Sequence, residues 1–292
     1  MSDIRFDMDR FLRILSRGSG TNGQSAASGD CLFRVSYATD TGYIRETNED
    51  SFFIDGKCVH RFGYSERDCY SEESEGTHIF GVFDGMGGEE HGEVASELCA
   101  KALDGAYTHL VTAAPEELHS LMTGVCRSAN AAVCKMIKER GARAGGSTFT
   151  AACITAKQAH VYWLGDSRVY FYNGSVLKQL TRDQTVAAAK IAAGEYTAEE
   201  AVGSRDNHAL TNFVGMNRLA EGMTVSACEP VPFRKGCSLL LCSDGLTDMI
   251  FESEISQVLS VGYADPASEF VTRALLNGGM DNVTCVVVTR MK

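Results

Sequence analysis

The stretch Val82-Phe83-Asp84-Gly85-Met86-Gly87-Gly88 joins an apolar segment to a carboxylate and a run of glycines. The apolar, β-prone residues before it predict a strand over His78–Phe83, with Asp84-Gly85 in the turn that follows. An Asp-Gly pair after a strand is by itself usually only a turn. Its meaning here depends on how many other acidic segments occupy the same kind of position.

Three further acidic segments lie at predicted strand ends. Glu49-Asp50 precedes a predicted strand over Ser51–Ile54, and Asp281-Asn282 precedes one over Val283–Thr289. Asp244-Gly245 follows a predicted strand over Ser238–Cys242. Because strand ends gather at a sheet edge, we expect these carboxylates to converge. Converging carboxylates repel one another and stay ionised only around a cation. Oxygen ligands select magnesium, manganese or calcium over zinc.

The remaining pattern predicts an α+β domain of short antiparallel strands and a central helix pair. Residues 1–30 form a short amphipathic helix over 4–15 and a flexible linker, and residues 31–292 form the folded domain. Gly165–Ser167 is expected to be a hairpin turn, and Glu66–Glu75 a solvated face or a disordered loop. The other predicted strands are Leu32–Ala38, Phe149–Thr155, Ala159–Leu164, Arg168–Tyr172, Val176–Leu180 and Met223–Cys228; the predicted helices are Gly92–Ala113, Pro115–Arg140, Glu252–Ser260 and Pro266–Asn277.

Composition excludes several classes of protein. The formal net charge is −11, and residues 46–93 hold 13 acidic against three basic residues, so a nucleic-acid-binding surface is not expected. No apolar run approaches the roughly 18 residues that a membrane helix needs, so no membrane contact is expected. The 11 cysteines are scattered without zinc-like pairs, which indicates reduced thiols and a cytoplasmic location.

The chain resembles the metal-dependent serine/threonine protein phosphatases of type 2C, the PPM family, most of all its compact bacterial members. The resemblance covers about residues 31–290 and implies a four-layer α-β-β-α sandwich, two antiparallel sheets flanked by helices. The matching segments, in the family's order, are Arg45 with Asn48-Glu49-Asp50, Val82 to Gly88, Gly92-Glu93-Val94-Ala95-Ser96, Gly146-Ser147-Thr148, Leu164 to Arg168, Leu180 to Gln184, Ser243 to Asp248 and Asp281-Asn282-Val283-Thr284.

The resemblance also implies a centre of two Mn²⁺ or Mg²⁺ ions, with a possible third. Asp84 would bridge the two core ions and hold the nucleophilic water, and Arg45 would bind the phosphoryl group with its guanidinium fork. Asp166 would hold the third ion together with Asp244. The implied metal ligands are Glu49, Asp50, Asp84, the Gly85 carbonyl, Asp166, Asp244 and Asp281.

Two departures from the family pattern bear on mechanism. Met86 stands where eukaryotic members carry a histidine that is a candidate general acid, and a methionine has no proton to donate. His91 is the nearest alternative in sequence, although a surface histidine at a helix start is the more ordinary interpretation. The segment Lys57–Thr77 is long, acidic and extra. Residues 185–215 match the position of the family's flap beside the active site.

The resulting hypothesis is an enzyme that hydrolyses phosphoserine and phosphothreonine in proteins and counteracts a serine/threonine kinase. One alternative is a regulatory phosphatase of an anti-sigma-type phosphoprotein. Another is a non-catalytic binding module on the same fold. Such a module would be recognised by the loss of ligand carboxylates, and none of them is missing here. A structural calcium-binding protein would leave Arg45 without a role.

Overall fold

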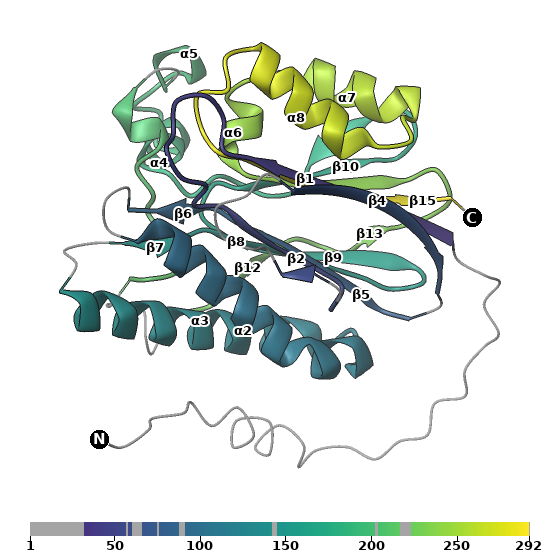
Figure 1. The fold of residues 1–292 in the computed structure, drawn as a ribbon, viewed down its shortest axis with the longest axis horizontal. Helices are drawn as coiled ribbons and strands as arrows, with labels where there is room; N and C mark the ends of the chain where they lie inside the picture. The colour runs from purple at the N-terminus through teal and green to yellow at the C-terminus, as the bar shows by residue number, and fades with distance from the viewer. Residues whose placement is uncertain are drawn as a thin grey trace.

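The computed structural model describes residues 32–56, 58–59, 66–74, 76–87, 91–141, 145–201, 204–216 and 223–291. Two antiparallel sheets lie face to face, and a pair of helices covers the outer face of each (Figure 1). This is the expected four-layer α-β-β-α sandwich. The helix predicted over 4–15 and the linker after it lie outside the described residues.

The β1 sheet has six strands in the order β11-β10-β14-β15-β1-β4, and helices α7 and α8 pack on its outer face (Figure 1). Helix α8 begins with Pro266, and Asp265 caps it by accepting a hydrogen bond from the Ser268 N–H at 3.1 Å. The elements are β1 (Leu32–Asp40), β4 (Glu66–Glu73), β10 (Arg168–Tyr172), β11 (Leu177–Gln179), β14 (Ser238–Cys242), β15 (Val283–Arg290), α7 (Glu252–Val261) and α8 (Pro266–Leu276).

The β5 sheet has the order β12-β9-β8-β5-β2-β3, with β13 also paired to β9, and helices α2 and α3 cover it. Its elements are β2 (Ser51–Ile54), β3 (Cys58–Val59), β5 (His78–Phe83), β8 (Phe149–Ile154), β9 (Gln158–Leu164), β12 (Ser226–Ala227), β13 (Val231–Pro232), α2 (Gly92–Thr112) and α3 (Leu118–Arg140). The remaining elements are the small pair β6 (Gly85–Met86) and β7 (Gly146–Ser147), and the helices α4 (Val186–Ala192), α5 (Ala198–Ala201), η2 (Arg205–Asn207) and α6 (Asp244–Thr247).

Three apolar layers hold the sandwich together. One lies between the sheets and includes Phe52 and Phe80, one lies under α2 and α3, and one lies under α7 and α8 around Phe270. Every residue of β5 is buried, because this central strand is covered on both faces. Each fully buried large apolar side chain contributes about 1.5–3 kcal/mol. The frame is therefore stable enough to hold unfavourable groups at its ends.

The turn at Gly165–Ser167 is not the predicted hairpin. Strand β9 before it pairs with β8 in one sheet, whereas β10 after it pairs with β14 in the other. The turn therefore carries the chain across the sandwich, which a sequence pattern of two adjacent strands does not reveal. Gly165 makes the crossing with a φ of +101°.

The acidic stretch Glu66–Glu73 is also not a loop, because it forms β4 at the edge of the β1 sheet and pairs with β1 along its length. Tyr70 packs inward against the core between the sheets. His78 on β5 lies 2.6 Å from Asp55 and 3.4 Å from Glu72 of β4, which ties this edge strand to the other sheet. An edge strand is held by main-chain hydrogen bonds and does not need alternating apolar residues. The charged side chains on its outer face are therefore the reason why the sequence pattern did not predict β4.

Other predicted bounds differ by a few residues. Helix α3 begins at Leu118, three residues after Pro115, and Glu117 takes the N-cap position. Only Ser226–Ala227 of the strand predicted over Met223–Cys228 is β-structure. The strands predicted over Ser51–Ile54, His78–Phe83, Arg168–Tyr172 and Ser238–Cys242 are confirmed to the residue.

Two glycines allow the acidic strand ends to approach one another. A Cβ on Gly85 would overlap the carbonyl oxygens of Gly92 and Glu49. A Cβ on Gly245 would overlap the Asn282 carbonyl oxygen. In each Asp-Gly pair the glycine lacks a side chain, so the backbone of another segment can pack directly against the glycine backbone.

We expect Gly245→Ala to lower the thermal unfolding temperature by several degrees, because inserting a methyl into a packed contact costs about 1–3 kcal/mol. The matched control is Gly105→Ala on the exposed face of α2, where a Cβ meets nothing within 4 Å. That change should stabilise the helix by up to about 1 kcal/mol. Thermal unfolding followed by circular dichroism measures both, and an unchanged midpoint for Gly245→Ala would contradict the close packing.

Candidate active site

The loop between β1 and β2, residues 41–50, is clamped by one asparagine. The Asn282 amide nitrogen donates to the carbonyl oxygens of Thr41 and Thr47, both at 2.9 Å. Its side-chain oxygen accepts from the Glu49 N–H at 2.8 Å. These bonds fix the loop against the start of β15, so Glu49 and Asp281 are held next to the same asparagine.

Asp50 lies behind this loop and connects the two sheets. It is only 2% exposed, and its Oδ2 accepts a hydrogen bond from the Ser243 hydroxyl at 2.8 Å. Ser243 directly precedes Asp244 at the end of β14. The start of β2 in one sheet is thereby tied to the end of β14 in the other.

Asp84 follows β5 and is held by its backbone. Its N–H donates to Thr148 Oγ1 at 2.9 Å, and its carbonyl accepts from the Thr148 N–H at 2.8 Å. The carboxyl group is left free of the backbone and shares a hydrogen bond with the Asp244 carboxyl. Two acidic side chains from different sheets therefore touch.

Arg45 reaches the same place from the β1–β2 loop. Its Nη2 lies 2.6 Å from Asp281 Oδ2, and the Arg45 side chain is 48% exposed. An ion pair this exposed contributes little to stability. The guanidinium therefore remains available to bind an anion that enters from solvent.

These groups line one cavity of about 420 Å³. Six predicted site residues are in its wall: Arg45, Glu49, Asp84, Gly85, Asp244 and Asp281. Asp50 and Asp166 are not in the wall but lie buried beside it, close enough to raise the pKa of Asp84. The carboxylates come together from both sheets at one end of the sandwich, and not from one sheet edge as the sequence suggested.

Asp166 is fixed by the crossover turn and its neighbours. The Arg168 guanidinium binds the Asp183 carboxylate through two nitrogens, at 2.6 and 3.0 Å. Gln184 and Gly165 exchange two hydrogen bonds of 3.1 Å. The turn that carries Asp166 is therefore locked to the residues that begin the flap segment.

The carboxyl groups are too crowded to ionise together. Burial, reinforced by the charge of Asp244, raises the pKa of Asp84 well above its usual range. Burial likewise raises the pKa of Asp50 to about 7, and burial with the charge of Asp244 raises the pKa of Asp166 to about 8. Burial alone would raise the pKa of Asp244 too, but hydrogen bonds from His208 and Asp84 hold it below its usual range.

His208 is the residue that sequence reasoning missed. It lies in the flap segment after η2, lines the cavity, and places Nδ1 3.5 Å from Asp244 and 3.9 Å from Asp248. The hydrogen bond to Asp244 raises the pKa of His208 to about 9, so the ring is cationic at neutral pH. A lone histidine in an irregular segment carries no motif, and only the fold brings it here.

The residues fit a site for hard divalent cations. The donors are carboxylate and carbonyl oxygens. Burial, together with the charges of neighbouring carboxylates, raises the pKa values of Asp84, Asp50 and Asp166, and a bound divalent cation would favour their ionised forms. His91 does not join the cavity wall, and its Nδ1 is hydrogen-bonded to Arg140 at 2.9 Å. It is a surface histidine at the start of α2, as the ordinary interpretation expects.

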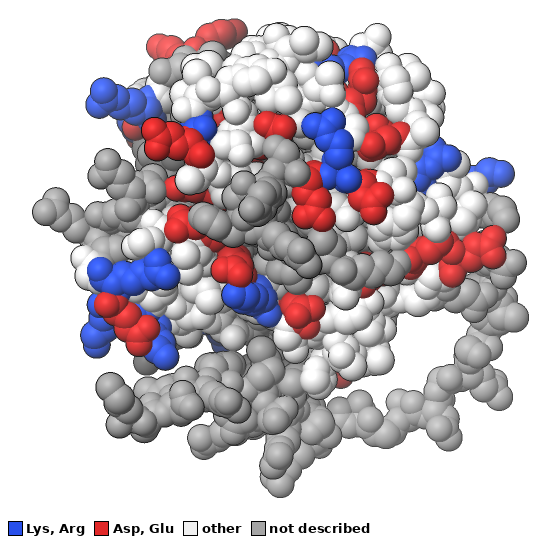
Figure 2. Space-filling view, in the orientation of Figure 1, with Lys and Arg blue, Asp and Glu red and all other residues white. Residues whose placement is uncertain are grey.

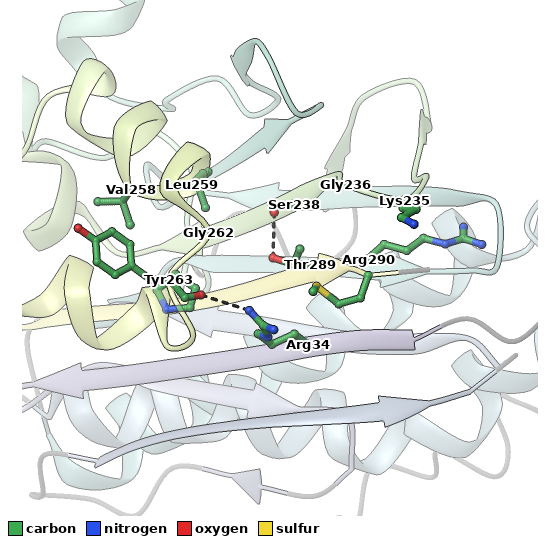
Figure 3. A pocket seen from close by; sticks show the side chains of 12 residues that line it. Arg34, Lys235, Gly236, Ser238, Val258, Leu259, Gly262, Tyr263, Thr289 and Arg290 are labelled. Carbon is green, nitrogen blue, oxygen red and sulfur yellow. Dashed lines mark hydrogen bonds between the residues drawn. The ribbon is translucent and has the colours of Figure 1, made fainter.

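A second depression, of about 300 Å³, lies at the opposite end of the β1 sheet (Figure 3). None of the described residues in its wall is acidic, and several of its polar groups already have partners. Arg34 donates to the Tyr263 carbonyl at 3.3 Å, and the Ser238 and Thr289 hydroxyls lie 2.8 Å apart. It lacks the ligands for a metal, so the cavity around Asp84 is the candidate active site.

Surface and helix composition add two observations. On the face shown in Figure 2, basic and acidic groups are interspersed among the coloured residues and form no continuous basic surface. Among the described residues, no helix is both long and apolar enough to cross a membrane.

Known proteins are similar to this chain in fold and in sequence. Residues 61–278 match the family model of protein phosphatase 2C. The serine/threonine phosphatase stp of Listeria monocytogenes is 32% identical over 260 residues, which cover 87% of this chain and 94% of stp. The crystal structure of the Mycobacterium tuberculosis serine/threonine phosphatase PstP/Ppp has 28% identity and a TM-score of 0.70, covering 88% of this chain and 98% of that one.

A further solved structure bears on the metal. It is the catalytic domain of the phosphatase PstP in complex with two manganese ions, with 26% identity and a TM-score of 0.70 over 90% of this chain and all of that one. The chain therefore belongs to the protein phosphatase 2C family, whose members are metal-dependent protein-serine/threonine phosphatases.

We expect Asp84→Asn to make the metal-free protein more stable. The folded-state pKa values of Asp50, Asp84 and Asp166 are raised above the unfolded value of about 3.9. The contribution of Asp50 and Asp166 to stability is therefore complete only below about pH 4 and is lost as pH rises through about 7 to 8, and the contribution of Asp84 is lost in the same direction. The amide removes one of these groups and still donates to Asp244.

The measurement is the unfolding midpoint at pH 8 in chelator and in excess Mn²⁺. In chelator the variant should melt several degrees above the parent, since 1 kcal/mol shifts a domain of this size by about 2–4 °C. In Mn²⁺ the order should reverse, because only the parent gains strongly from binding. Asp104→Asn on the exposed face of α2 is the control and should change neither value. The same order in both buffers would contradict carboxylate crowding.

Proposed function

We propose that this enzyme hydrolyses phosphoserine and phosphothreonine in proteins at the cavity around Asp84, with Mn²⁺ or Mg²⁺ as cofactor. The observation that carries the proposal is the convergence of buried carboxyl groups from both sheets beside an exposed arginine. A site built only to hold cations has no use for a guanidinium at its mouth, whereas a phosphoryl group requires one.

We assign the metal-binding role to Glu49, Asp50, Asp84, Asp166, Asp244, Asp281 and the Gly85 carbonyl. Asp84 is the residue placed to serve two core ions, because its carboxyl group meets Asp244 from the other sheet and lies within the influence of Asp50 and Asp166. Asp166 lies in the crossover turn and outside the cavity wall, which suits a third, peripheral ion. When bound, such ions lower the pKa of a water towards neutrality and offset charge on the phosphoryl oxygens.

Arg45 binds and orients the substrate in this proposal. Its fork presents parallel N–H donors to two phosphoryl oxygens, and Asp281 holds the guanidinium at the cavity mouth until substrate arrives. In the transition state the negative charge spreads over the same oxygens, so the contact strengthens as the reaction proceeds.

Leaving-group protonation is assigned to water of the open cavity. Met86 lines the wall but carries no proton, and His91 is engaged with Arg140 outside it. An alkoxide leaving group in an accessible cavity can take its proton from solvent. Neither Met86 nor His91 therefore acts as a fixed general acid in this proposal.

The non-catalytic alternative is not favoured, because every predicted ligand carboxylate is present at or beside the cavity. No observation favours an anti-sigma-type phosphoprotein over other substrates. We further propose that the enzyme opposes a serine/threonine kinase in the cytoplasm. The nine cysteines whose side chains the structure describes are all free thiols, which suits a reducing compartment.

The experiment that tests the function is turnover of a phosphothreonine peptide with and without metal. Activity should vanish in excess chelator and return with Mn²⁺ or Mg²⁺. Asp84→Asn should lower kcat by roughly a thousandfold, because losing the activating cation removes several kcal/mol of transition-state stabilisation. Asp104→Asn should turn over normally. Full activity in chelator would exclude the proposed mechanism.

We expect Arg45→Ala to lower kcat/KM by about 10–100-fold, the range for losing hydrogen bonds to a charged group. Arg45→Lys should recover only part of the loss, because lysine restores the charge without the bidentate fork. Arg67→Ala on the exposed face of β4 is the matched control. Steady-state kinetics on one phosphopeptide measures all three, and parent-like kinetics for Arg45→Ala would return Arg45 to an ordinary surface role.

A further inference from the structure

Large apolar side chains are exposed beside the active site on the side of Arg45. Tyr43 is 68% exposed, Ile44 62% and Met280 54%. Single exposed apolar residues are normal, but contiguous ones mark interaction sites. Tyr43 and Ile44 come from the loop between β1 and β2, and Met280 comes from the connection between α8 and β15. These two segments lie side by side in Figure 1.

The two segments are joined by backbone contacts. The Tyr43 N–H donates to the Gly279 carbonyl at 2.8 Å, and Gly279 has a φ of +52°. A Cβ on Gly279 would lie 3.1 Å from the Tyr43 ring, so the ring packs directly on this glycine. The exposed side chains are therefore presented by a built platform.

Methionines extend the platform into the cavity. Met249 and Met280 both have sulfur atoms within 4 Å of the same point above Gly278. Both also line the cavity that contains Arg45 and Asp281. We call Tyr43, Ile44, Met249 and Met280 the apolar rim. Tyr43 and Ile44 are exposed on the β1–β2 loop, and the two methionines line the cavity.

A bound phosphopeptide would bring its neighbouring residues to this rim. Ile44 is adjacent in sequence to Arg45, which binds the phosphoryl group in the proposed function. Consecutive Cα atoms are 3.8 Å apart, so side chains one or two positions from the phosphorylated residue are within reach of the rim. Glu46 and Asp248 flank it, so an acidic peptide residue would be repelled.

We propose that the apolar rim binds a large apolar side chain located within two residues of the phosphorylated serine or threonine. This assignment rests on the proposed function and adds its substrate class: phosphoproteins with an aromatic or large aliphatic residue flanking the phosphosite. Continuity with the catalytic cavity selects a substrate segment as the occupant over a second copy of this chain.

The test uses phosphothreonine peptides in an alanine background. Each carries one Phe or one Asp at position −2, −1, +1 or +2 from the phosphothreonine, and an aryl phosphate serves as the rim-independent substrate. Enzymes are the parent, the double variant Tyr43→Ser/Ile44→Ser, and Val176→Ser. Val176 is 60% exposed in the β10–β11 hairpin and is absent from the cavity wall, so it is the matched control.

For the parent, at least one Phe peptide should exceed the all-alanine peptide in kcat/KM by about tenfold, the scale of one apolar contact in substrate discrimination. The double variant should reduce that preference to within about twofold while hydrolysing the aryl phosphate normally. Val176→Ser should keep the full preference. Asp at the preferred position should fall below alanine.

The outcomes separate the two proposals. Equal efficiency on all peptides, or an intact Phe preference in the double variant, would overturn the rim assignment and leave the proposed function in place. Hydrolysis of the aryl phosphate with no turnover of any phosphopeptide would overturn the proposed function and the rim with it. Concentration-dependent self-association that the double variant abolishes, with no Phe preference in the parent, would make the rim a dimer contact.

Discussion

Mutual repulsion among buried carboxyl groups is the constraint on which this structure depends. Asp84 and Asp244 touch across the two sheets, and Asp50 and Asp166 lie close enough to keep the pKa of Asp84 raised. The apolar layers between and outside the sheets supply the stability that holds these groups together. The neighbouring backbone is organised for the same purpose, since Gly85 after Asp84 and Gly245 after Asp244 let the strand ends meet.

Positioning in this site relies on neutral hydrogen bonds more than on charge. Asn282 fixes the β1–β2 loop through three bonds, and Ser243 links Asp50 to the other sheet. The Ser243 hydrogen bond favours the ionised form of Asp50, but burial outweighs it and keeps the pKa of Asp50 raised, so a bound cation would still stabilise the carboxylate. Where charge is compensated, at Arg45 and His208, the cationic groups lie at the exposed mouth and in the flap segment. The hydrogen bonds of Asn282 and Ser243 therefore hold the inner part of the site, and the cationic side chains of Arg45 and His208 lie where ligands enter.

Much of the frame was predictable because local pattern and tertiary role agree there. The strand His78–Phe83 and the helices α2 and α8 have the periodicity that their burial requires, and α8 also has an Asp265 cap. The Asp-Gly and Asp-Asn segments identified four cavity-wall residues, and the segment from Arg45 to Asp50 identified Arg45 and Glu49, because these short motifs recur in the family. Three features were not predictable for physical reasons. The sequence of the turn at Gly165–Ser167 does not reveal whether the strands on either side of it share a sheet. The edge strand β4 needs no apolar alternation. His208 has a role only because the fold places it beside Asp244 and Asp248.

The charged edge strand has a consequence for how the molecules behave in concentrated solution. An uncovered sheet edge is a template on which another chain can add a strand, the first step of fibrous aggregation. In the described part of the chain the sheets end in β11, β3 and β12, of two or three residues each, or in β4. Only β4 is long enough to recruit a strand, and Arg67, Asp68 and Glu73 stand exposed along it. The charged side chains of β4 thus disfavour the addition of a strand from another copy of this enzyme at the only described sheet edge that is long enough for it.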